Sequence, residues 1–571
     1  MEMPIEVMPE RTGHITLKSD CGEAALPRCE QATVPGVISQ RACALYGARW
    51  MLAAVKDVIH LVHGPVGCAY NAGTVRRKSY SIATTCLEER DIIFGGREKL
   101  RRTITEAVHL HPEAEGVLVY VTCAAGLIGE DVEAICREAS STLGRPVAPV
   151  LCPGFCGVGQ GDGHDAAAEA LLEHFIDRGE PGPVLENSVN ILGEFDVQGD
   201  LKEIEKLLAH LGLNIVCAVS GRATVENMSR ARRAALNIVH CRRTGQAMAD
   251  VMEKRYGIPQ MKVSFFGLEE TARALKAVGR FFHRDGVERW VQDRVVAARR
   301  QAAPYLHRLA GKRVAVFFGA SRMGSMAKAF RELGMELIMA GSQFGCREDY
   351  REAGRCLDEG TLLLDDANER ELTEFLRRRR PHLLVGGTRE KFLAHKLGVP
   401  FLVFPQETSP YAGFNGFVNL AREVAVLLDA PVWRLVRPGW ESGPEQPVLP
   451  ENVKVAVASR DGMYVDEHFG RAEKFLVFTL AGRKVKKIEV RAVKGGAVNC
   501  RDGAARGFPG EKLDLLEDCR AVVCLAAGHC ARERAAEKGL LIMETSDAVP
   551  AALDDCIRMI NGEGRTDGST N

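Results

Sequence analysis

The chain has 571 residues, of which 46% are hydrophobic and 26% are charged. This length exceeds what one hydrophobic core supports, so three or four compact units are expected, and the hydrophobic content excludes a largely disordered protein. The 75 basic residues equal the 75 acidic ones, which excludes binding to nucleic acid or to a membrane surface through net charge.

The amino-terminal stretch MEMPIEVMPERTGH lacks the basic start and the apolar core of a signal peptide. No apolar run reaches the roughly 18 residues of a membrane span. We therefore expect a soluble, cytoplasmic protein that has neither nucleic acid nor a membrane as partner. Its 18 cysteines are then expected to stay reduced, so metal or cluster ligation is considered before disulfides, with buried packing as the ordinary alternative.

From about residue 45, short β-rich runs alternate with amphipathic stretches, which is the pattern of parallel sheets covered by helices. Helical spacing of apolar residues over ALYGARWMLAAVKDVIH (44–60) predicts one long helix with Cys43 at its amino end. The turn HGPVGCAYNAG (63–73), which contains Cys68, is expected to follow this helix. The next predicted elements are a strand at GVLVYVT (116–122), ended by Cys123, and a helix at GEDVEAICREASSTL (129–143).

Two more strand–helix–strand openings, at SVNILGEFD (188–196) and KRVAVFFGA (312–320), predict two further Rossmann-like units in an α/β fold. The stretch VRPGWESGPEQPVLPEN has four prolines and no periodicity, which is typical of a linker. A small module with strands of its own follows the linker. The predicted units are an amino-terminal extension (1–40), three Rossmann-like units (41–187, 188–310 and 311–435), the linker (436–452), the module (453–560) and a disordered polar tail (561–571).

Cys43, Cys68 and Cys123 each occupy a junction between elements. Free backbone N–H groups at such junctions lower the pKa of a thiol and favour the thiolate, which is the form that binds a metal. The spacings of 25 and 55 residues do not match the close cysteine pairs of a zinc site. By spacing alone, either a shared cluster site or three isolated structural cysteines fits the sequence.

Five stretches, taken in order from about residue 40 to 435, resemble the nitrogenase component 1 family: ACALYGA, DVIHLVHGPVGCAYNAG, ERDIIFGGREKL, VYVTCAAGLIGEDVEAIC and YGIPQMKVSFFG. Within this family the chain looks most like the NifE type, the α-type scaffold subunit on which the iron–molybdenum cofactor is matured. The stretch VTCAAGLIGED is especially similar to that type. The resemblance implies the component 1 fold of three Rossmann-like units.

The resemblance also implies a cluster and partners. Cys43, Cys68 and Cys123 match cysteines that hold a [4Fe–4S] cluster at a subunit interface. Because such a cluster takes four thiolates, the fourth ligand is expected from a NifN-like β-subunit, in a heterotetramer. The further partners implied are the nitrogenase reductase (Fe protein), a cofactor-supplying NifB protein and apo component 1.

A second site is implied for a precursor of the iron–molybdenum cofactor. Cys241 matches the cysteine that binds one end of the cofactor in catalytic relatives, with a buried structural cysteine as the alternative. The other residues matched to cofactor contacts are Arg76, Gln160, His164, Arg322 and Arg389. Gln160 and His164 resemble the catalytic α-subunit, and for them a glycine-rich loop without function is the alternative. The position of the catalytic subunit's anchoring histidine is Pro405 here, so a cargo tethered at one end is expected.

Residues 453–560 resemble the NifX/NafY family and the carboxyl end of NifB, which implies a small α/β (RNase H-like) carrier domain for the cofactor. In the stretch DEHFGRA, His468 matches a cofactor-contact histidine and Arg471 adds charge, with a plain surface histidine as the alternative. The sequence thus predicts a scaffold subunit for cofactor maturation with a fused carrier. The alternatives are a catalytic α-type subunit of an alternative nitrogenase or related reductase, and an iron–sulfur storage or chaperone protein.

Overall fold

A computed structural model describes residues 11, 13–18, 26–27, 43–73, 82–154, 158–404, 409–433, 453–481, 484–493 and 509–560. The chain divides into two compact units, residues 1–440 and 441–571, and each is described by itself. Arg76, Pro405, the predicted linker and the predicted tail lie outside the described residues. None of the helices within the described ranges is long and apolar enough to cross a membrane.

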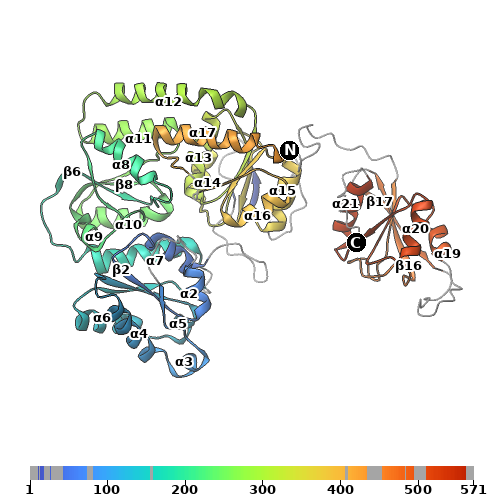
Figure 1. Ribbon diagram of the computed structural model, residues 1–571, viewed down its shortest axis with the longest axis horizontal. Coiled ribbons are helices and arrows are strands. Elements are labelled where there is room, and N and C mark those ends of the chain that lie inside the picture. The colour runs from blue at the N-terminus through green and yellow to red at the C-terminus, as the bar shows by residue number, and fades with distance from the viewer. Residues whose placement is uncertain are drawn as a thin grey trace. The chain divides into compact units, whose positions relative to one another are not determined.

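Three sheets form the first unit, and Figure 1 shows them as three lobes coloured blue, green and yellow. The strand orders are β3-β2-β4-β5, β7-β6-β8-β9 and β1-β12-β11-β10-β13-β14, with every pair parallel except β1 and β12. This confirms the predicted α/β class with three Rossmann-like parallel sheets. The strands are β1 (Ile15–Leu17), β2 (Val58–His63), β3 (Ile82–Thr84), β4 (Gly116–Val121), β5 (Val147–Leu151), β6 (Leu185–Leu192), β7 (Asn214–Ala218), β8 (Ala234–Val239), β9 (Gln260–Lys262), β10 (Arg313–Phe317), β11 (Glu336–Ser342), β12 (Leu362–Asp365), β13 (Leu383–Gly386) and β14 (Phe401–Val403).

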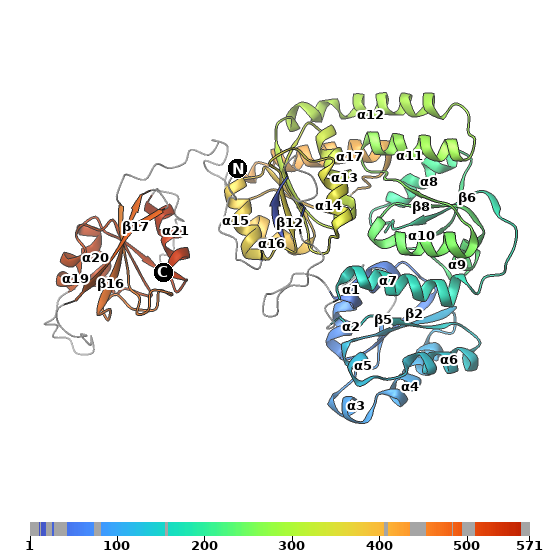
Figure 2. The ribbon, with the colours of Figure 1, turned by 180° about the vertical axis from the view of Figure 1, so that it is seen from behind.

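Helices cover both faces of the first sheet, as Figure 2 shows. One face packs on α1 (Ala44–Leu52) and α7 (Gln160–Leu171), and the other on α4 (Arg97–Leu110), α5 (Cys123–Ile128) and α6 (Val132–Leu143). The central strands β2 and β4 are therefore buried along their whole length. Their nearly continuous apolar sequences follow from this two-sided burial.

The helix predicted over residues 44–60 is wrong beyond Leu52. Residues Val58–His63 instead form β2, which pairs with β3 and β4. An unbroken apolar run matches helical spacing by chance, and β-branched residues between two helical layers favour a strand. Cys68 therefore follows a strand and lies within α2 (Val66–Gly73), not in a turn after a helix.

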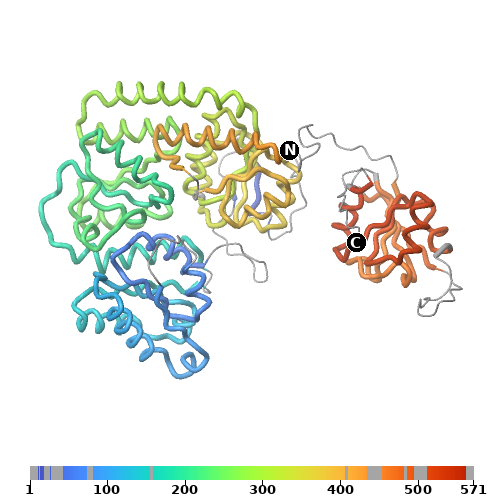
Figure 3. The backbone as a smooth tube through the Cα atoms, viewed as in Figure 1, coloured from blue at the N-terminus to red at the C-terminus, as the bar shows by residue number. Residues whose placement is uncertain are grey.

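The second and third lobes share a layer of long helices. α11 (Leu268–Phe281), α12 (Val287–Leu309) and α17 (Gly413–Asp429) pack against one another, and α12 spans both lobes along the top of Figure 1. In Figure 3 the chain can be followed from green through yellow until the orange α17 returns beside α11. Side chains from these helices and from both sheets form one continuous buried core. The packing therefore joins the two lobes to each other.

The amino-terminal segment adds a strand to the edge of the third sheet. β1 pairs antiparallel with β12, and His14 Nδ1 lies 3.1 Å from Asp365 Oδ2. Arg11 Nε donates to Glu371 Oε1 at 2.9 Å. Part of the predicted extension is thus held on the third lobe by strand pairing and by these side-chain contacts.

Strand order determines where the functional loops meet. In each sheet two neighbouring strands send their following loops in opposite directions, which opens a crevice beyond their carboxyl ends. These switch points lie between β2 and β4, between β6 and β8, and between β10 and β13. The chain beyond the carboxyl ends of these strands carries Cys68, Cys123, Cys241, Arg322 and Arg389. The predicted site residues therefore fall where parallel sheets of this kind bind ligands.

The second unit is one five-stranded sheet of order β17-β16-β15-β18-β19. β16 runs antiparallel to both of its neighbours, and the other pairs are parallel. Separate apolar clusters cover its two faces. The small carboxyl-terminal α/β domain predicted from the sequence is thus confirmed. Its elements are β15 (Val453–Val457), β16 (Lys474–Ala481), β17 (Lys484–Ala492), α19 (Pro509–Leu515), β18 (Ala521–Cys524), α20 (His529–Glu537), β19 (Leu541–Glu544) and α21 (Val549–Ile560).

Gly193 lets the end of β6 pass close to Cys241. Its φ of +86° is rare for other residues, and a Cβ at Gly193 would lie 2.6 Å from Cys241 Cβ and 2.8 Å from Cys241 N. Glycine alone meets both demands, because it tolerates positive φ and has no Cβ.

We expect the variant Gly193→Ala to destabilise the first unit and to displace Cys241. Overpacking adds about 1–3 kcal/mol to a φ strain of about 1–2 kcal/mol. Gly257→Ala is the matched control, because Gly257 has a φ of +70° but no atom within 4 Å of its Cβ position. Equilibrium unfolding in denaturant measures both variants, and equal losses of unfolding free energy would contradict this account.

The second unit is expected to fold without the first. Its sheet is covered on both faces by its own apolar clusters, which is the property of an independent domain. Residues 441–571 expressed alone should show one cooperative thermal transition, at the midpoint that this unit has in the full chain. A fragment without a cooperative transition would show that the unit needs contacts with the rest of the chain.

Candidate functional site

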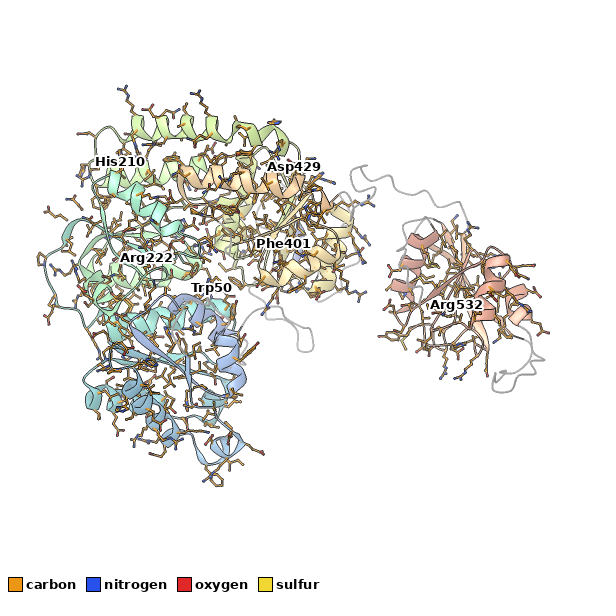
Figure 4. The ribbon with its side chains drawn as sticks, in the orientation of Figure 1. Trp50, His210, Arg222, Phe401, Asp429 and Arg532 are labelled. Atoms are coloured by element: carbon orange, nitrogen blue, oxygen red, sulfur yellow. The ribbon has the colours of Figure 1, made fainter. Side chains whose placement is uncertain are left out.

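A cavity of about 160 Å³ is lined by all three lobes of the first unit. Figure 4 shows Trp50, one of its lining residues, on the side of the first lobe that faces the other two. The structure brings five of the predicted cofactor-binding residues together in this cavity. They are Gln160, His164, Cys241, Arg322 and Arg389.

Four helices begin at the cavity wall. They are α7, α10 (Arg242–Tyr256), α13 (Ala320–Glu332) and α16 (Thr388–Lys396), and each contributes residues of its first turn to the lining. The first N–H groups of a helix lack partners within the helix, and the helix dipole is positive at that end. The four helix starts therefore favour an anionic ligand in the cavity.

Cys241 caps α10 and is 6% exposed. Its Sγ lies 2.9 Å from Ser321 Oγ and 3.4 Å from Thr244 Oγ1. Among the lining residues of the described chain, Cys241 is the only cysteine. The cavity thus offers a single cysteine sulfur to a metal-containing ligand.

His164 presents an unsatisfied nitrogen in the same cavity. Its Nδ1 lies 3.3 Å from Thr244 Oγ1, whereas its Nε2 is buried and has no hydrogen-bond partner among the described residues. Burial, together with the charge of Arg243, lowers the pKa of His164 to about 3, so the imidazole is neutral at pH 7. Leaving a buried nitrogen unpaired costs free energy, so Nε2 is a position in the cavity wall where a bound ligand or a water can make a hydrogen bond.

Arg322 is held by a buried anion. It donates to Gly193 O at 2.9 Å and to Glu194 Oε2 at 3.2 Å, and its guanidinium lies 5.2 Å from the ring centroid of Phe195. Burial alone would raise the pKa of Glu194, but the Arg322 charge and the neighbouring His240, whose Nδ1 lies 3.1 Å from Oε2, outweigh it and lower this pKa to about 2. Glu194 thus neutralises the charge of Arg322. The positive potential in the cavity therefore comes mainly from the N-terminal ends of the four helices.

A carboxyl group also lines the cavity. Gln343 Nε2 donates to Glu390 Oε1 at 2.9 Å, and burial raises the pKa of Glu390 to about 7. Arg389 precedes it in the first turn of α16 and has an exposed side chain. The third lobe thus contributes both a cation and a carboxyl group that titrates near neutrality.

The three predicted cluster cysteines lie near one another in the first lobe. Cys43 caps α1, Cys68 lies in α2 and Cys123 begins α5, and all three are half-buried. The pKa of Cys68 is raised first by burial and then by the neighbouring Cys123 and Cys43. Gly154 N donates to Cys123 Sγ at 3.1 Å, and the same glycine packs against Cys43.

No three His, Cys, Asp or Glu side chains of the described chain surround a position for one metal ion. The described residues therefore offer no zinc-type site. A four-iron cluster differs, because each of its four irons takes one thiolate, so the cysteine sulfurs need not converge on a single position. Cys152, which was not predicted, lies beside the trio, and burial followed by the Cys43 charge raises its pKa strongly. It is thus a protonated thiol packed next to the three half-buried ones.

The contact between α1 and α7 joins the two groups of residues. A Cβ on Gly47 would overlap the backbone of α7, and a Cβ on Gly163 would overlap the backbone of α1. α1 begins after Cys43 and carries Tyr46 and Trp50 into the cavity wall. One short helix thus connects the cysteine trio with the cavity.

In the second unit, His468 and Arg471 lie in one turn, where Arg471 N donates to His468 O at 2.9 Å. His468 Nδ1 accepts a hydrogen bond from Gly470 N at 3.0 Å. The neutral ring then carries its proton on Nε2 and presents an N–H donor. Iron ligation by His468 through Nε2 would require the ring to give up its bond to Gly470.

Several lining residues were not predicted from the sequence. They are Tyr46, Trp50, Phe195, Thr244, Ser321, Gln343 and Glu390. For three of these a signal existed: Thr244 lies three residues after Cys241 on the same helical face, Ser321 directly precedes Arg322, and Glu390 directly follows Arg389. The others meet the cavity only through packing between lobes.

Comparison with known proteins gives two family matches. The model of the family described as nitrogenase component 1 type oxidoreductase matches residues 43–429. The model described as dinitrogenase iron-molybdenum cofactor matches residues 451–559. The two matches fall within the two compact units of the structure.

Similar proteins carry two different names. The nitrogenase molybdenum-iron protein alpha chain of Methanothermobacter marburgensis is 37% identical over 463 residues, covering 76% of this chain and 98% of its own. The nitrogenase iron-molybdenum cofactor biosynthesis protein NifE of Methanococcus maripaludis is 39% identical over 426 residues, covering 72% of this chain and 88% of its own. The solved structure of nitrogenase Cp1 at pH 5 superposes with a TM-score of 0.70 at 28% identity, covering 76% of this chain and 99% of that one. With more than half of its length matched by one family model, this chain belongs to the nitrogenase component 1 family.

Proposed function

We propose that this chain is an α-type scaffold subunit for maturation of the nitrogenase iron–molybdenum cofactor, acting in the cytoplasm. Relatives named NifE and relatives named alpha chain match it about equally, so the names do not decide between assembly and catalysis. The observation that carries the proposal is a cavity with one thiolate, in a chain that also has a domain of the iron–molybdenum cofactor family.

The cavity suits an anionic iron–sulfur precursor as cargo. Cys241 supplies one thiolate for iron, and four helix starts and Arg389 favour the negative charge of the cargo. His164 is neutral and adds no charge to the cavity. The stretch FPQETSPYAG (404–413) contains no histidine to anchor the other end. A cargo held through one sulfur can be loaded, modified and released.

The cysteine trio suits a resident [4Fe–4S] cluster shared with a NifN-like β-subunit. Cys43, Cys68 and Cys123 supply three thiolates, and the partner would supply the fourth ligand. Such a cluster carries single electrons. Large apolar side chains are exposed around the trio, with Val66 and Tyr70 on α2 at 66% and 79%, and Leu127 on α5 at 69%. Exposed apolar groups beside an incomplete set of cluster ligands favour a subunit interface at this position. The heterotetramer is proposed from the family, not from this surface.

The proposed pathway includes further partners. A NifB protein would supply the precursor, the nitrogenase reductase would donate electrons, and apo component 1 would receive the product. The carboxyl-terminal unit, by its family, would carry the cofactor between these steps, with His468 and Arg471 in its contact turn.

A catalytic α-type subunit is the second candidate. His164 and Gln160 favour it, because a neutral imidazole and an amide in the cavity wall suit substrate reduction at a bound cofactor. The two functions are separated by supplying reductase, MgATP and apo component 1 to the loaded complex. Transfer of the cluster to apo component 1 supports the scaffold. Sustained acetylene reduction with the cluster retained would instead assign catalysis.

Cys241→Ala is expected to remove the cargo and to spare the interface cluster. The complex with its β partner is purified anaerobically, and its iron content and paramagnetic resonance are measured. Iron assigned to the cargo should fall by at least about tenfold, because losing even a residue that supports a metal ligand costs about 10–100-fold in metal affinity. Cys68→Ala should instead remove the signal of the interface cluster. Cys217→Ala is the control, because Cys217 is buried in β7 outside both sites and burial raises its pKa to about 12. Retention of both signals in Cys241→Ala and Cys68→Ala would overturn the two-site proposal.

Separating the carrier from the scaffold is expected to slow cofactor delivery. A tether of the length of residues 436–452 holds the carrier at an effective concentration of about millimolar. A chain cut there, with residues 453–571 added at micromolar concentration, should deliver cofactor to apo component 1 roughly 1000-fold more slowly. Raising the added module towards millimolar concentration should restore the rate. Equal rates for the cut and uncut chains would contradict a carrier role that depends on the fusion.

A further inference from the structure

Two hydroxyl groups from different lobes converge on the Cys241 sulfur. Ser321 Oγ of α13 lies 2.9 Å from Sγ, although the two residues are 80 positions apart in sequence. Thr244 Oγ1, one turn along α10 from Cys241, lies 3.4 Å from the same atom. Cys241 is nearly buried. The two contacts are therefore fixed by the surrounding packing.

The direction of these hydrogen bonds depends on the state of the sulfur. A thiolate, free or bound to iron, has no proton and accepts only. With Cys241 as thiolate, both Ser321 and Thr244 must therefore donate to Sγ. The Thr244 oxygen is then free to accept from His164 Nδ1 at 3.3 Å. In the thiol state, by contrast, Cys241 can donate its own proton to Ser321.

The same chain of bonds fixes the histidine tautomer. If Thr244 donates to Sγ, His164 donates through Nδ1, and its proton is therefore absent from Nε2. That leaves Nε2 as a buried acceptor without a partner among the described residues. The sulfur, the two hydroxyls and the imidazole thus form one hydrogen-bond network in the cavity wall, in which the thiolate determines the direction of each bond.

We propose that Ser321 and Thr244 are positioning residues that hold the Cys241 thiolate through two hydrogen bonds and thereby ease release of its iron-bound cargo. The inference rests on the proposed function, because it concerns the bond between Cys241 and that cargo. Negative charge grows on the sulfur as the iron–sulfur bond breaks, and the two donors stabilise this charge. Hydrogen bonds to the bound sulfur also withdraw electron density from iron, which raises the reduction potential of the cluster.

Ser321→Ala is the informative variant, because it removes one donor from Sγ. Ser325→Ala is its matched control on the same helix, since Ser325 Oγ donates to the Arg322 carbonyl at 3.1 Å and does not line the cavity. Thr244→Val removes the second donor but also leaves His164 Nδ1 without its partner. Thr244→Ser retains the hydroxyl and should therefore behave as the wild type.

The hydrogen bond is tested first on the full chain without cargo. Raman difference spectra in the S–H stretching region, with Cys241→Ser subtracted, isolate the band of the Cys241 thiol. In Ser321→Ala this band should move to higher frequency, because the thiol has lost its acceptor, whereas Ser325→Ala should leave it in place. An unshifted band in Ser321→Ala would overturn the proposal.

The effect on the cargo is tested on the anaerobic complex with its β partner. The probe is the iron–sulfur cluster present after purification, and the readouts are its paramagnetic spectrum and the rate of iron loss to excess chelator. Ser321→Ala should shift the spectrum and slow iron loss by about tenfold, the scale of one hydrogen bond to a charged group. Thr244→Ser should match the wild type. Iron loss at an unchanged or faster rate in Ser321→Ala, despite the Raman shift, would overturn the tuning role.

Failure of the proposed function looks different. A wild-type complex without cavity iron would overturn the scaffold proposal and the release role together. The Raman shift would still report the Ser321 bond to Cys241. The inference is supported if iron loss is slowed in Ser321→Ala and Thr244→Val and occurs at the wild-type rate in Ser325→Ala.

Discussion

The close packing of α1 on α7 is the constraint on which both sites depend. Gly47 and Gly163 let the two backbones touch, and a single methyl group at either position would separate the helices. α1 carries Cys43 at its start and Trp50 in the cavity wall, while α7 carries His164. The distance between the cysteine trio and the cavity is therefore set by a backbone contact, which is stiffer than one between flexible side chains.

Electrostatics in the cavity is organised in two layers. Inside the wall, Glu194 and Arg322 neutralise one another, and His240 Nδ1 lies 3.1 Å from the same carboxylate. At the surface of the cavity, helix starts provide partial positive charge and His164 stays neutral. Because the wall holds its own charges in balance, an arriving anion meets prearranged dipoles and displaces no ion pair. Such prearrangement lowers the cost of taking a charged cluster out of water.

The alternating pattern of strands and helices was enough to predict the fold class, and family motifs identified Gln160, His164, Cys241, Arg322 and Arg389, which the structure places in one cavity. The boundary between α1 and β2 was missed, because a continuous apolar run satisfies both periodicities until tertiary burial decides. Ser321 was also missed. Its contact with Cys241 crosses two lobes and 80 positions, and no local pattern encodes such a contact. The unsatisfied Nε2 of His164 could be recognised only from burial and missing partners, which are properties of the folded chain.

The cavity wall has one more consequence, because it is shared among three lobes that each enclose a separate sheet. No lobe contains a complete wall, so the cavity lies at the interface of the three lobes. A ligand bound there would contact all three lobes and restrict their relative motion, in addition to stabilising the folded chain. Loaded and empty forms would then differ in stiffness, a difference that a partner protein could sense without touching the cargo.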